Sequence, residues 1–316
     1  ASSGIAWKVP LPGPGASGAV VSSGRVFVTC YSGHLVPGMP GGSTASLKRH
    51  LLCLEASSGK TVWEKVVPAK LPEEEKIRDH GYAASTPLVD DKLVYAFFGK
   101  SGLHAFSLDG VKAWEADVGT STSGWGSAAS PVACGDLVVV NASVESGSII
   151  ALDRATGKER WRAGGIKESW NTPVVVPDGA GGKQLVVAIA GKVLGLDPAT
   201  GKTAWSCATD IRWYMVPSIV HENGLVCCIG GRSGIASLGL KTGGAGDITA
   251  SGRLWTGQKG SNVSSPILHD GHLYWMNDQQ GIAYCAKAST GEIVYEERIA
   301  GAGQVYASPV LAGGHI

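Results

Sequence analysis

Apolar residues along this chain come in short runs that polar and turn-forming residues interrupt. The run 185–190, one of the longest, ends after six residues at Gly191. Runs of this length, bounded by glycine, proline or aspartate, are typical of short β-strands. None approaches the roughly 18–20 consecutive apolar residues that a transmembrane helix needs. The pattern therefore predicts an all-β chain without a transmembrane segment.

One segment recurs along the chain: an apolar strand, a turn of the form Asp-x-x-Thr-Gly-Lys, and a strand that carries a tryptophan. Copies lie at residues 152–161, 196–205, 54–63 and 108–114, and more divergent copies lie at 240–255 and 288–295. Glycine allows the positive φ of such a turn, and Asp and Thr side chains can bond the turn backbone. The series of rings that these copies define is Trp7, Trp63, Trp114, Trp161, Trp205, Trp255 and Tyr295.

A second motif recurs with the same period. In each repeat, a dipeptide ending in proline opens an alternating apolar strand. It occurs at residues 86–87, 130–131, 172–173, 216–217, 265–266 and 308–309. Proline is tolerated at the start of a strand, where the ladder does not need its N–H. Each period of about 40–50 residues holds four short strands, which is the content of one β-propeller blade. We expect the ring series to be structural and to fill the gap between neighbouring blades.

The repeats predict a single β-propeller domain over residues 1–316, made of antiparallel four-stranded blades. Six complete blades are expected at residues 15–66, 80–118, 125–165, 168–208, 213–259 and 262–299. A seventh blade begins at residue 304, and Trp7 stands on an outer strand without the three strands that would precede it. Two interpretations remain open. The chain is a C-terminally truncated part of an eight-bladed ring, or it closes as seven blades.

The composition of the chain argues against several classes of function. The chain has 46 glycines without a collagen period, in agreement with many tight turns. Its 27 Lys and Arg residues nearly balance 26 Asp and Glu residues, so it lacks the basic field of a nucleic-acid-binding protein. The seven cysteines contain no CxxC pair, which excludes a zinc ribbon or a haem-attachment motif. No signal peptide is visible at the N-terminus.

The Ser-Pro-Val, Leu-Asp-x-x-Thr-Gly-Lys and Trp elements resemble the tryptophan-docking repeat of quinoprotein-like, PQQ-binding-like propellers, over essentially the whole chain. That family includes PQQ-dependent alcohol dehydrogenases and BamB-like propellers of bacterial envelopes. The resemblance implies a non-catalytic scaffold of the periplasm or cell envelope that binds protein or peptide partners, with no cofactor. It leaves two alternatives: a PQQ- and calcium-dependent alcohol or sugar dehydrogenase, and a propeller that binds polysaccharide or a small ligand.

The candidate ligand-binding residues are aromatic side chains just before the first strand of a blade, where the chain enters the mouth of a propeller. They are Tyr82, Trp125, Trp170, Trp213, Tyr214 and Tyr306. Such rings could stack on a flat ligand or grip a peptide. In PQQ enzymes of the family, a tryptophan at this place stacks on the quinone. The alternative is that these rings pack the loops between blades.

No catalytic residue and no metal site are predicted. Asn141 is a weak candidate for a calcium ligand, with Glu145 close to it in sequence; a turn residue at a strand end is the competing interpretation. The adjacent pair Cys227 and Cys228 lies within a plain strand, where neighbouring residues point to opposite faces. We expect them to be buried thiols. Cys53 occupies a position that is Ala or Gly in other blades, which indicates a tight core position.

Two stretches interrupt the repeat. Residues 33–48 form an insertion in the first blade, rich in Gly, Pro and Ser. Residues 68–78 are the most charged part of the chain and are expected to form a short helix between blades. Insertions of this kind decorate one face of a propeller and often contact partners, although a solvated loop is the default.

Overall fold

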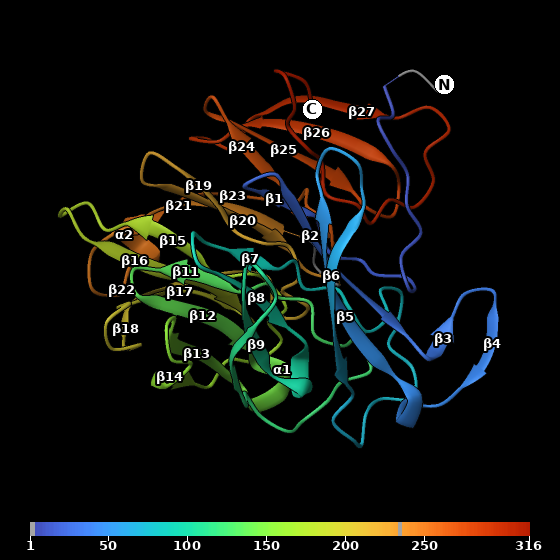
Figure 1. Cartoon of the computed structure of the whole chain (residues 1–316). Helices are drawn as coiled ribbons and strands as arrows, with labels where there is room; N and C mark the ends of the chain where they lie inside the picture. The colour runs from blue at the N-terminus through green and yellow to red at the C-terminus, as the bar shows by residue number, and fades with distance from the viewer. Residues whose placement is uncertain (1–3, 233–235) are drawn as a thin grey trace. The chain divides into compact units, whose positions relative to one another are not determined.

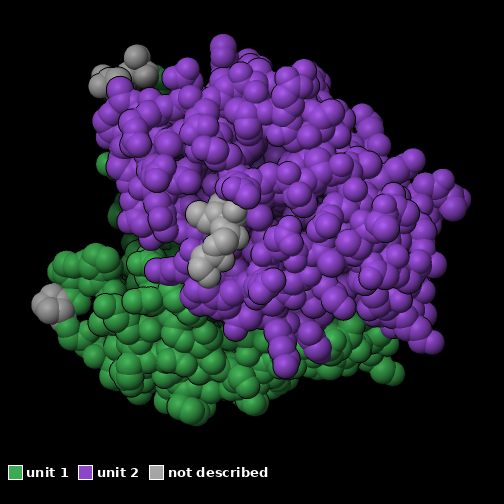
Figure 2. All heavy atoms as spheres, turned by 180° about the vertical axis from the view of Figure 1, so that it is seen from behind, with its two compact units in different colours: residues 1–164 green, residues 165–316 purple. Residues whose placement is uncertain are grey.

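The computed structural model describes residues 4–232 and 236–316. The chain divides into two compact units, residues 1–164 and residues 165–316, which Figure 2 shows in green and purple. Each unit contains three consecutive sheets, and each sheet corresponds to one predicted blade. We number the blades 1 to 6 in chain order and describe the two units separately.

The first unit holds three antiparallel four-stranded sheets (Figure 1). Blade 1 consists of β1 (Val20–Ser22), β2 (Arg25–Ser32), β5 (Lys48–Glu55) and β6 (Thr61–Pro68). Blade 2 consists of β7 (Leu88–Val89), β8 (Leu93–Phe97), β9 (Leu103–Ser107) and β10 (Lys112–Ala116). Blade 3 consists of β11 (Val132–Cys134), β12 (Leu137–Ala142), β13 (Ser148–Asp153) and β14 (Glu159–Gly164). Two single turns of helix, η2 (Gly99–Ser101) and α1 (Ser143–Ser146), join the second and third strands of blades 2 and 3.

The second unit repeats this arrangement. Blade 4 consists of β15 (Val174–Pro177), β16 (Lys183–Ile189), β17 (Lys192–Leu196) and β18 (Thr203–Ala208). Blade 5 consists of β19 (Val220–Glu222), β20 (Leu225–Gly230), β21 (Ala236–Lys241) and β23 (Arg253–Gly257). Blade 6 consists of β24 (Ile267–His269), β25 (His272–Asn277), β26 (Ile282–Lys287) and β27 (Ile293–Arg298). The six predicted four-strand sets are thus confirmed.

The apolar core lies between consecutive sheets. On β8, Val94 packs with Phe27 of blade 1, whereas the next residue, Tyr95, packs with Val138 of blade 3. Successive side chains of a strand point to opposite faces, so each central strand buries both of its faces. This explains why the inner strands are short apolar runs instead of alternating apolar and polar residues.

Four rings of the tryptophan series donate a hydrogen bond from the indole Nε1 to a backbone carbonyl in a turn between the third and fourth strands of a sheet. The pairs are Trp7 with Ala56 (2.9 Å), Trp63 with Leu108 (2.9 Å), Trp114 with Arg154 (2.9 Å) and Trp255 with Ala288 (2.7 Å). In the last three pairs the acceptor belongs to the blade that follows the tryptophan. The rings therefore bind consecutive blades together, as their repeated spacing predicted.

The tryptophan ring also packs against the glycine of the turn and leaves no space there for a side chain. A Cβ added to Gly157 would lie 2.5 Å from the Trp114 ring, and one added to Gly291 would lie 2.5 Å from the Trp255 ring. Both glycines also have positive φ, +72° and +72°. A side chain at either position would meet both backbone strain and a clash.

The residue opposite each ring on the neighbouring strand is small. The cross-strand pairs are Cys53 with Trp63, Ala105 with Trp114, Ala151 with Trp161, Gly195 with Trp205, Gly239 with Trp255 and Cys285 with Tyr295. A Cβ on Gly195 would lie 2.1 Å from the Trp205 ring, because that ring lies flat across the strand. The tight core position expected at Cys53 is confirmed.

Blade 4 departs from the pattern because blade 5 inserts a segment before its last strand. Within it, β22 (Gly246–Asp247) pairs in parallel with β18, and the helical turn α2 (Thr249–Gly252) follows. Trp205, paired with Gly246, is fully buried and donates its indole hydrogen bond to Oε1 of Gln184, 2.8 Å away. Tyr295, on the last strand of blade 6, is 40% exposed.

The segments that open the first strand of each blade form a second link between blades. A backbone N–H in one blade donates to the side-chain hydroxyl of the corresponding residue in the next; this residue precedes a proline in most blades, whereas Ser218 follows Pro217 and Gly18 has no proline beside it. The bonds run from Gly18 to Thr86 (2.8 Å), Thr86 to Ser130 (3.0 Å), Thr172 to Ser218 (3.3 Å), Ser218 to Ser265 (3.0 Å) and Ser265 to Ser308 (3.0 Å). The first strands of neighbouring blades are thus joined by hydroxyl groups instead of by a continuous sheet.

Three local expectations are wrong. Residues around Trp7 form no strand, since Pro10, Pro12 and Pro14 in this segment cannot donate to a ladder. Residues 304–316 form no strand pair beyond an isolated bridge, although Ser308 occupies the position of a further first strand. Residues 69–78 form bends instead of a helix, and the site described below explains why.

The insertion in blade 1 forms a hairpin of its own. Its strands are β3 (His34–Val36) and β4 (Met39–Gly42), followed by the 3-10 turn η1 (Thr44–Ser46). Figure 1 shows this hairpin projecting away from the sheet of blade 1. Leu35 and Met39 are 47% and 66% exposed, whereas His34 is buried and Val36 packs against the cluster that contains Tyr31 and Tyr82.

Candidate functional site

Three of the predicted ligand-binding residues form one aromatic cluster in the second unit. The ring centroids of Trp170 and Tyr214 are 5.5 Å apart, and those of Trp213 and Tyr214 are 5.4 Å apart. Trp170 and Tyr214 are buried, whereas Trp213 is 37% exposed. The cluster thus presents one indole to solvent on a base of two buried rings.

The backbone of the cluster is held by a pairing between two loops that lead into blades 4 and 5. The N–H of Trp170 donates to the carbonyl of Met215 (2.8 Å), and the N–H of Met215 donates to the carbonyl of Glu168 (3.0 Å). Glu168 and Tyr214 both have positive φ, +51° and +66°. A bulky residue with positive φ is an outlier that only a well-determined surrounding structure maintains.

A cation completes the cluster. The Arg232 guanidinium carbon lies 5.6 Å from the centroid of the Tyr214 ring, within the range of a cation–π interaction. Trp, Tyr and Arg are the residues that most often dominate protein–protein binding energy when they are clustered. An exposed indole on such a base can bury apolar or aromatic groups of a partner.

The other predicted ligand-binding residues have different environments. Tyr82 is buried and its hydroxyl donates to the carbonyl of Glu74 (2.8 Å); burial is the main cause that raises its pKa to about 12. The Trp125 ring is stacked against Arg78 at 4.7 Å. Tyr306 is 42% exposed and accepts a hydrogen bond from Gln304 (2.7 Å). Tyr82 and Trp125 therefore both contact residues of the loop before blade 2; that they bind a ligand stays a prediction.

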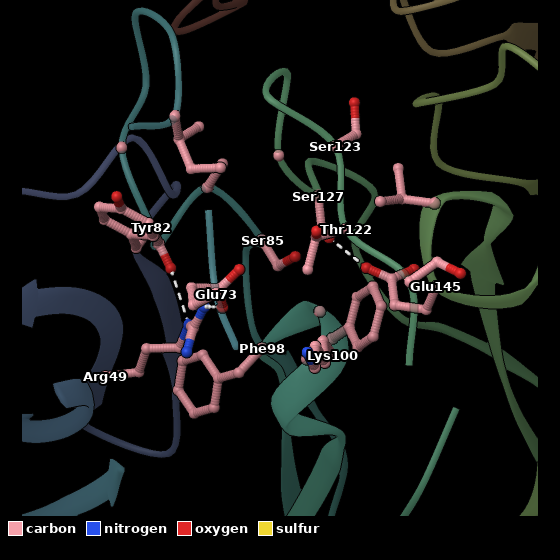
Figure 3. Close-up of a pocket in the computed structure, with 18 residues that line it drawn as sticks. Arg49, Glu73, Tyr82, Ser85, Phe98, Lys100, Thr122, Ser123, Ser127 and Glu145 are labelled. Carbon is pink, nitrogen blue, oxygen red and sulfur yellow. Dashed lines mark hydrogen bonds and ion pairs between the residues drawn. The ribbon is translucent and has the colours of Figure 1, made fainter. Parts of the chain in front are cut away.

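Tyr82 lies in the wall of a polar crevice in the first unit (Figure 3). The walls come from β5, from the loop before blade 2, from the end of β8 with η2, from the loop before blade 3, and from α1. Serine and threonine side chains of residues 121–127 form much of one wall. Loops from three consecutive blades thus meet around one space.

A buried ion pair forms one side of this crevice. Arg49 and Glu73 are in direct contact, and each side chain is only 5% exposed. Arg49 also donates to the carbonyl of Tyr82 (3.2 Å) and to the hydroxyl of Ser101 (3.0 Å). Lys100, also buried, donates to the carbonyl of Pro72. These contacts hold residues 72 and 73 in an irregular conformation, which is why the charged stretch forms no helix.

Glu145 forms the opposite side of the crevice. Its side chain is almost fully buried on α1, and Oε1 accepts a hydrogen bond from the hydroxyl of Ser127. The buried Oε2 has no hydrogen-bond partner among the described residues. Burial is the largest cause that raises the pKa of this carboxyl, to about 7, and the Ser127 hydrogen bond opposes it.

The weak calcium candidate has another role. Asn141 is buried near the end of β12, and its Oδ1 accepts the backbone N–H of Ser143, 3.1 Å away. It therefore starts the turn into α1. Across residues 4–232 and 236–316, no group of three or more His, Cys, Asp or Glu side chains is placed to hold a metal ion. Cys227 and Cys228 are buried thiols, as expected.

The sequence analysis named Glu145 only as a neighbour of Asn141, and it gave no sign that the charged groups of the crevice lie together. Arg49 and Glu73 lie 24 residues apart, and Ser127 and Glu145 lie 18 apart, so neither pair forms a local motif. The connection that carries Glu145, between β12 and β13, is as long as the one between β8 and β9, so its length gives no signal in the sequence.

Comparison with known proteins decides the family. A family model described as outer membrane protein assembly factor BamB matches residues 1–169, 145–213 and 171–297. The chain belongs to the BamB family. The predicted resemblance to PQQ-type repeat propellers is therefore confirmed. No match was found among curated protein sequences.

Solved structures confirm the fold. BamB of Moraxella catarrhalis superposes with a TM-score of 0.59 at 16% identity, covering 96% of this chain and 88% of that one. A europium-containing methanol dehydrogenase gives 0.63 at 14%, covering 93% and 70%. The quinohemoprotein alcohol dehydrogenase of Comamonas testosteroni gives 0.61 at 15%, covering 92% and 60%. At these identities the likeness shows the fold alone, which is the predicted β-propeller.

The BamB family is associated with the cell envelope, as its description states. In the part of the chain that the structure describes, no helix is both long enough and apolar enough to cross a bilayer.

Proposed function

We propose that this BamB-family propeller is a non-catalytic scaffold of the bacterial cell envelope that binds a protein or peptide partner. The observation that carries the proposal is the exposed Trp213 on its base of Trp170, Tyr214 and Arg232. The family description, an assembly factor for outer membrane proteins, supports a protein partner.

The geometry of the cluster favours binding. An indole that is held by buried neighbours loses little side-chain entropy when a partner covers it, so more of the burial energy contributes to affinity. Trp213 is held in this way by Tyr214, whose own backbone conformation is fixed by the pairing of Met215 with Glu168 and Trp170. The site is therefore pre-organised for contact with an apolar segment.

The dehydrogenase alternative is supported by two solved structures of similar fold, a methanol dehydrogenase and an alcohol dehydrogenase. PQQ is a polyanion that needs free cationic groups and a calcium ion held by carboxylate and amide oxygens. Arg49 is paired with the carboxylate of Glu73, and Lys100 donates a hydrogen bond to the carbonyl of Pro72. Among the described residues, no group of three or more His, Cys, Asp or Glu side chains is placed to hold a metal ion. With both cations engaged in this way, the crevice fits PQQ with calcium poorly.

The proposal can be tested by photo-crosslinking in the bacterium that encodes the chain. A photoreactive phenylalanine derivative at position 213 should give one crosslinked envelope protein. The same derivative at position 254 is the control, because Leu254 is 50% exposed in the same unit but lies outside the cluster. The purified partner should bind Trp213→Ala about 30-fold more weakly, which corresponds to roughly 2 kcal/mol at a binding hot spot. Leu254→Ala should change the affinity less than twofold.

A second measurement addresses the alternative directly. The purified chain is incubated with PQQ and Ca²⁺, and quinone absorbance and dye-coupled alcohol oxidation are followed. Saturable quinone binding with turnover would overturn the scaffold proposal. If the partner bound Trp213→Ala and the unaltered chain with equal affinity, the aromatic cluster would not be the binding site.

A further inference from the structure

Three segments of the first unit meet at Glu145. Its backbone carbonyl accepts the N–H groups of Thr120 and Ser121, both at 3.1 Å, from the loop that leads into blade 3. Its Oε1 accepts the hydroxyl of Ser127 at the other end of that loop. A Cβ added to Gly99, in the η2 turn, would lie 3.1 Å from the same oxygen. Glu145 thus connects α1, η2 and loop 119–127.

The second oxygen of this carboxyl has nothing to bond. Oε2 is buried, and no donor among the described residues reaches it. The other charged or titratable side chains that line the crevice are Arg49, Glu73, Lys100 and Tyr82. Arg49 is engaged with Glu73, Lys100 donates to Pro72, and no ion pair joins any described cation to Glu145. The arrangement suits a neutral carboxylic acid and is unfavourable for a carboxylate.

We propose that Glu145 is a proton-controlled contact: its neutral form holds loop 119–127 against α1, and its ionisation loosens that loop. An isolated buried carboxylate needs donors that the closed crevice does not supply, so water must reach it. The segment between Oε2 and solvent then has to open locally. Burial raises the pKa of Glu145 to about 7, which places the change in the neutral pH range.

The consequence concerns the shape of the crevice. Residues 121–123, 126 and 127 form one of its walls, so loosening loop 119–127 changes that wall. Trp125 lies in the same loop, with its ring stacked on Arg78 and its carbonyl bonded to His80 (2.7 Å). The pH-sensitive element and the aromatic cluster at Trp213 belong to different units, so the two proposals stand or fall separately.

Amide hydrogen exchange tests the proposal. Exchange of the Thr120 and Ser121 amides is compared at pH 6 and pH 8, after correction for the intrinsic dependence of exchange on pH. The carboxyl has a pKa near 7 when closed and an ordinary value when open, so protection should be about tenfold lower at pH 8. Glu145→Gln keeps the shape of the neutral acid, and its amides should show no such difference.

Two further variants make the result decisive. Glu75→Gln removes a carboxylate that is 82% exposed, and should keep the wild-type pH dependence. Ser127→Ala removes the hydrogen bond that favours the ionised form, so the transition should move to higher pH. The same pH dependence in Glu145→Gln as in the wild type overturns the proposal. Titration of the Glu145 carboxyl below pH 5.5 by ¹³C NMR overturns it as well.

Discussion

The indole Nε1 of Trp114 lies 2.9 Å from the backbone carbonyl of Arg154 and donates a hydrogen bond to it across the boundary between blades 2 and 3. The same ring covers Gly157 in the turn that contains Arg154. One side chain therefore bonds a turn carbonyl, which also accepts the Tyr95 hydroxyl (3.4 Å), fills the space between two sheets and restricts the conformation of a turn. Its contributions can be separated by substitution.

Trp114→Phe should retain most of the buried ring and lose the hydrogen bond. We expect the free energy of unfolding to fall by about 1–2 kcal/mol, measured by urea denaturation followed by circular dichroism. Val111→Ala is the control, since Val111 is 69% exposed. A Trp114→Phe variant as stable as this control would show that the indole bond contributes nothing.

Gly157→Ala should be more damaging than an ordinary glycine substitution in a turn. Gly135→Ala provides the comparison, because Gly135 has φ +61° but nothing within 4 Å of an added Cβ. Backbone strain alone should cost about 1 kcal/mol at Gly135. At Gly157 the clash with Trp114 adds to the strain, for about 3 kcal/mol in total. Equal losses in thermal denaturation would contradict the docking role of this turn.

The Arg49–Glu73 pair should show strong coupling. Arg49→Met leaves the carboxylate of Glu73 buried without its partner, and should destabilise the chain by about 3–5 kcal/mol. The double variant Arg49→Met, Glu73→Leu removes both charges and should recover most of that loss. Additive effects in this double-mutant cycle would mean that the two groups act independently.

The stability of the chain should depend on the ionisation of Glu145 between its unfolded pKa of 4.5 and its folded pKa of about 7. Its pKa is raised from 4.5 to about 7 on folding, so the folded state holds the proton more tightly than the unfolded state. Stability from this group is therefore present below pH 4.5 and is lost as the pH rises towards 7, by roughly 3 kcal/mol in total. Glu145→Gln should flatten the profile and be the more stable form at pH 8. A steeper profile in the variant would reverse this conclusion.

The cysteines should be unreactive in the folded chain. All seven are buried thiols, and burial raises the pKa of Cys30 to about 11 and that of Cys227 and Cys228 to about 12. Because the thiolate is the reactive form, Ellman's reagent should detect almost none of them before denaturation and all seven afterwards. Two fewer thiols in the denatured chain would indicate a disulfide.

The repeat made the fold predictable because every blade solves the same packing problem with the same residues. Trp63 and Trp114, their turn acceptors and the small residues opposite them are fixed by local geometry, so their spacing carries the information. The clustering of Trp170, Trp213 and Tyr214 also followed from the repeat, since each precedes the first strand of a blade. Their convergence with the remaining candidate rings stays a prediction.

The features that the sequence did not predict depend on contacts between distant segments. The conformation of residues 69–78 is set by contacts with Arg49 of β5 and Lys100 of η2, and not by the helix propensity of its glutamates. Trp7 was expected on a strand, but the prolines that follow it prevent a ladder, and its ring instead packs on the turn at Ala56 and Gly59 and on the apolar cluster of Cys30, Leu52 and Leu54. The raised pKa of Glu145 arises from burial that only the folded crevice creates.

The hydrogen bond from the indole of one blade to the turn of the next also matters when such a chain gains or loses a whole repeat. A blade such as blade 2 carries both halves of the bond: the carbonyl of Leu108 accepts from Trp63, and Trp114 donates onward to Arg154. If one whole repeat were duplicated or deleted, the new neighbours would still meet as a donor and an acceptor. Duplication or deletion of a repeat of this kind would therefore preserve the indole bond at the new boundary, whereas blade 4, whose Trp205 donates to Gln184 of its own sheet, lacks this property.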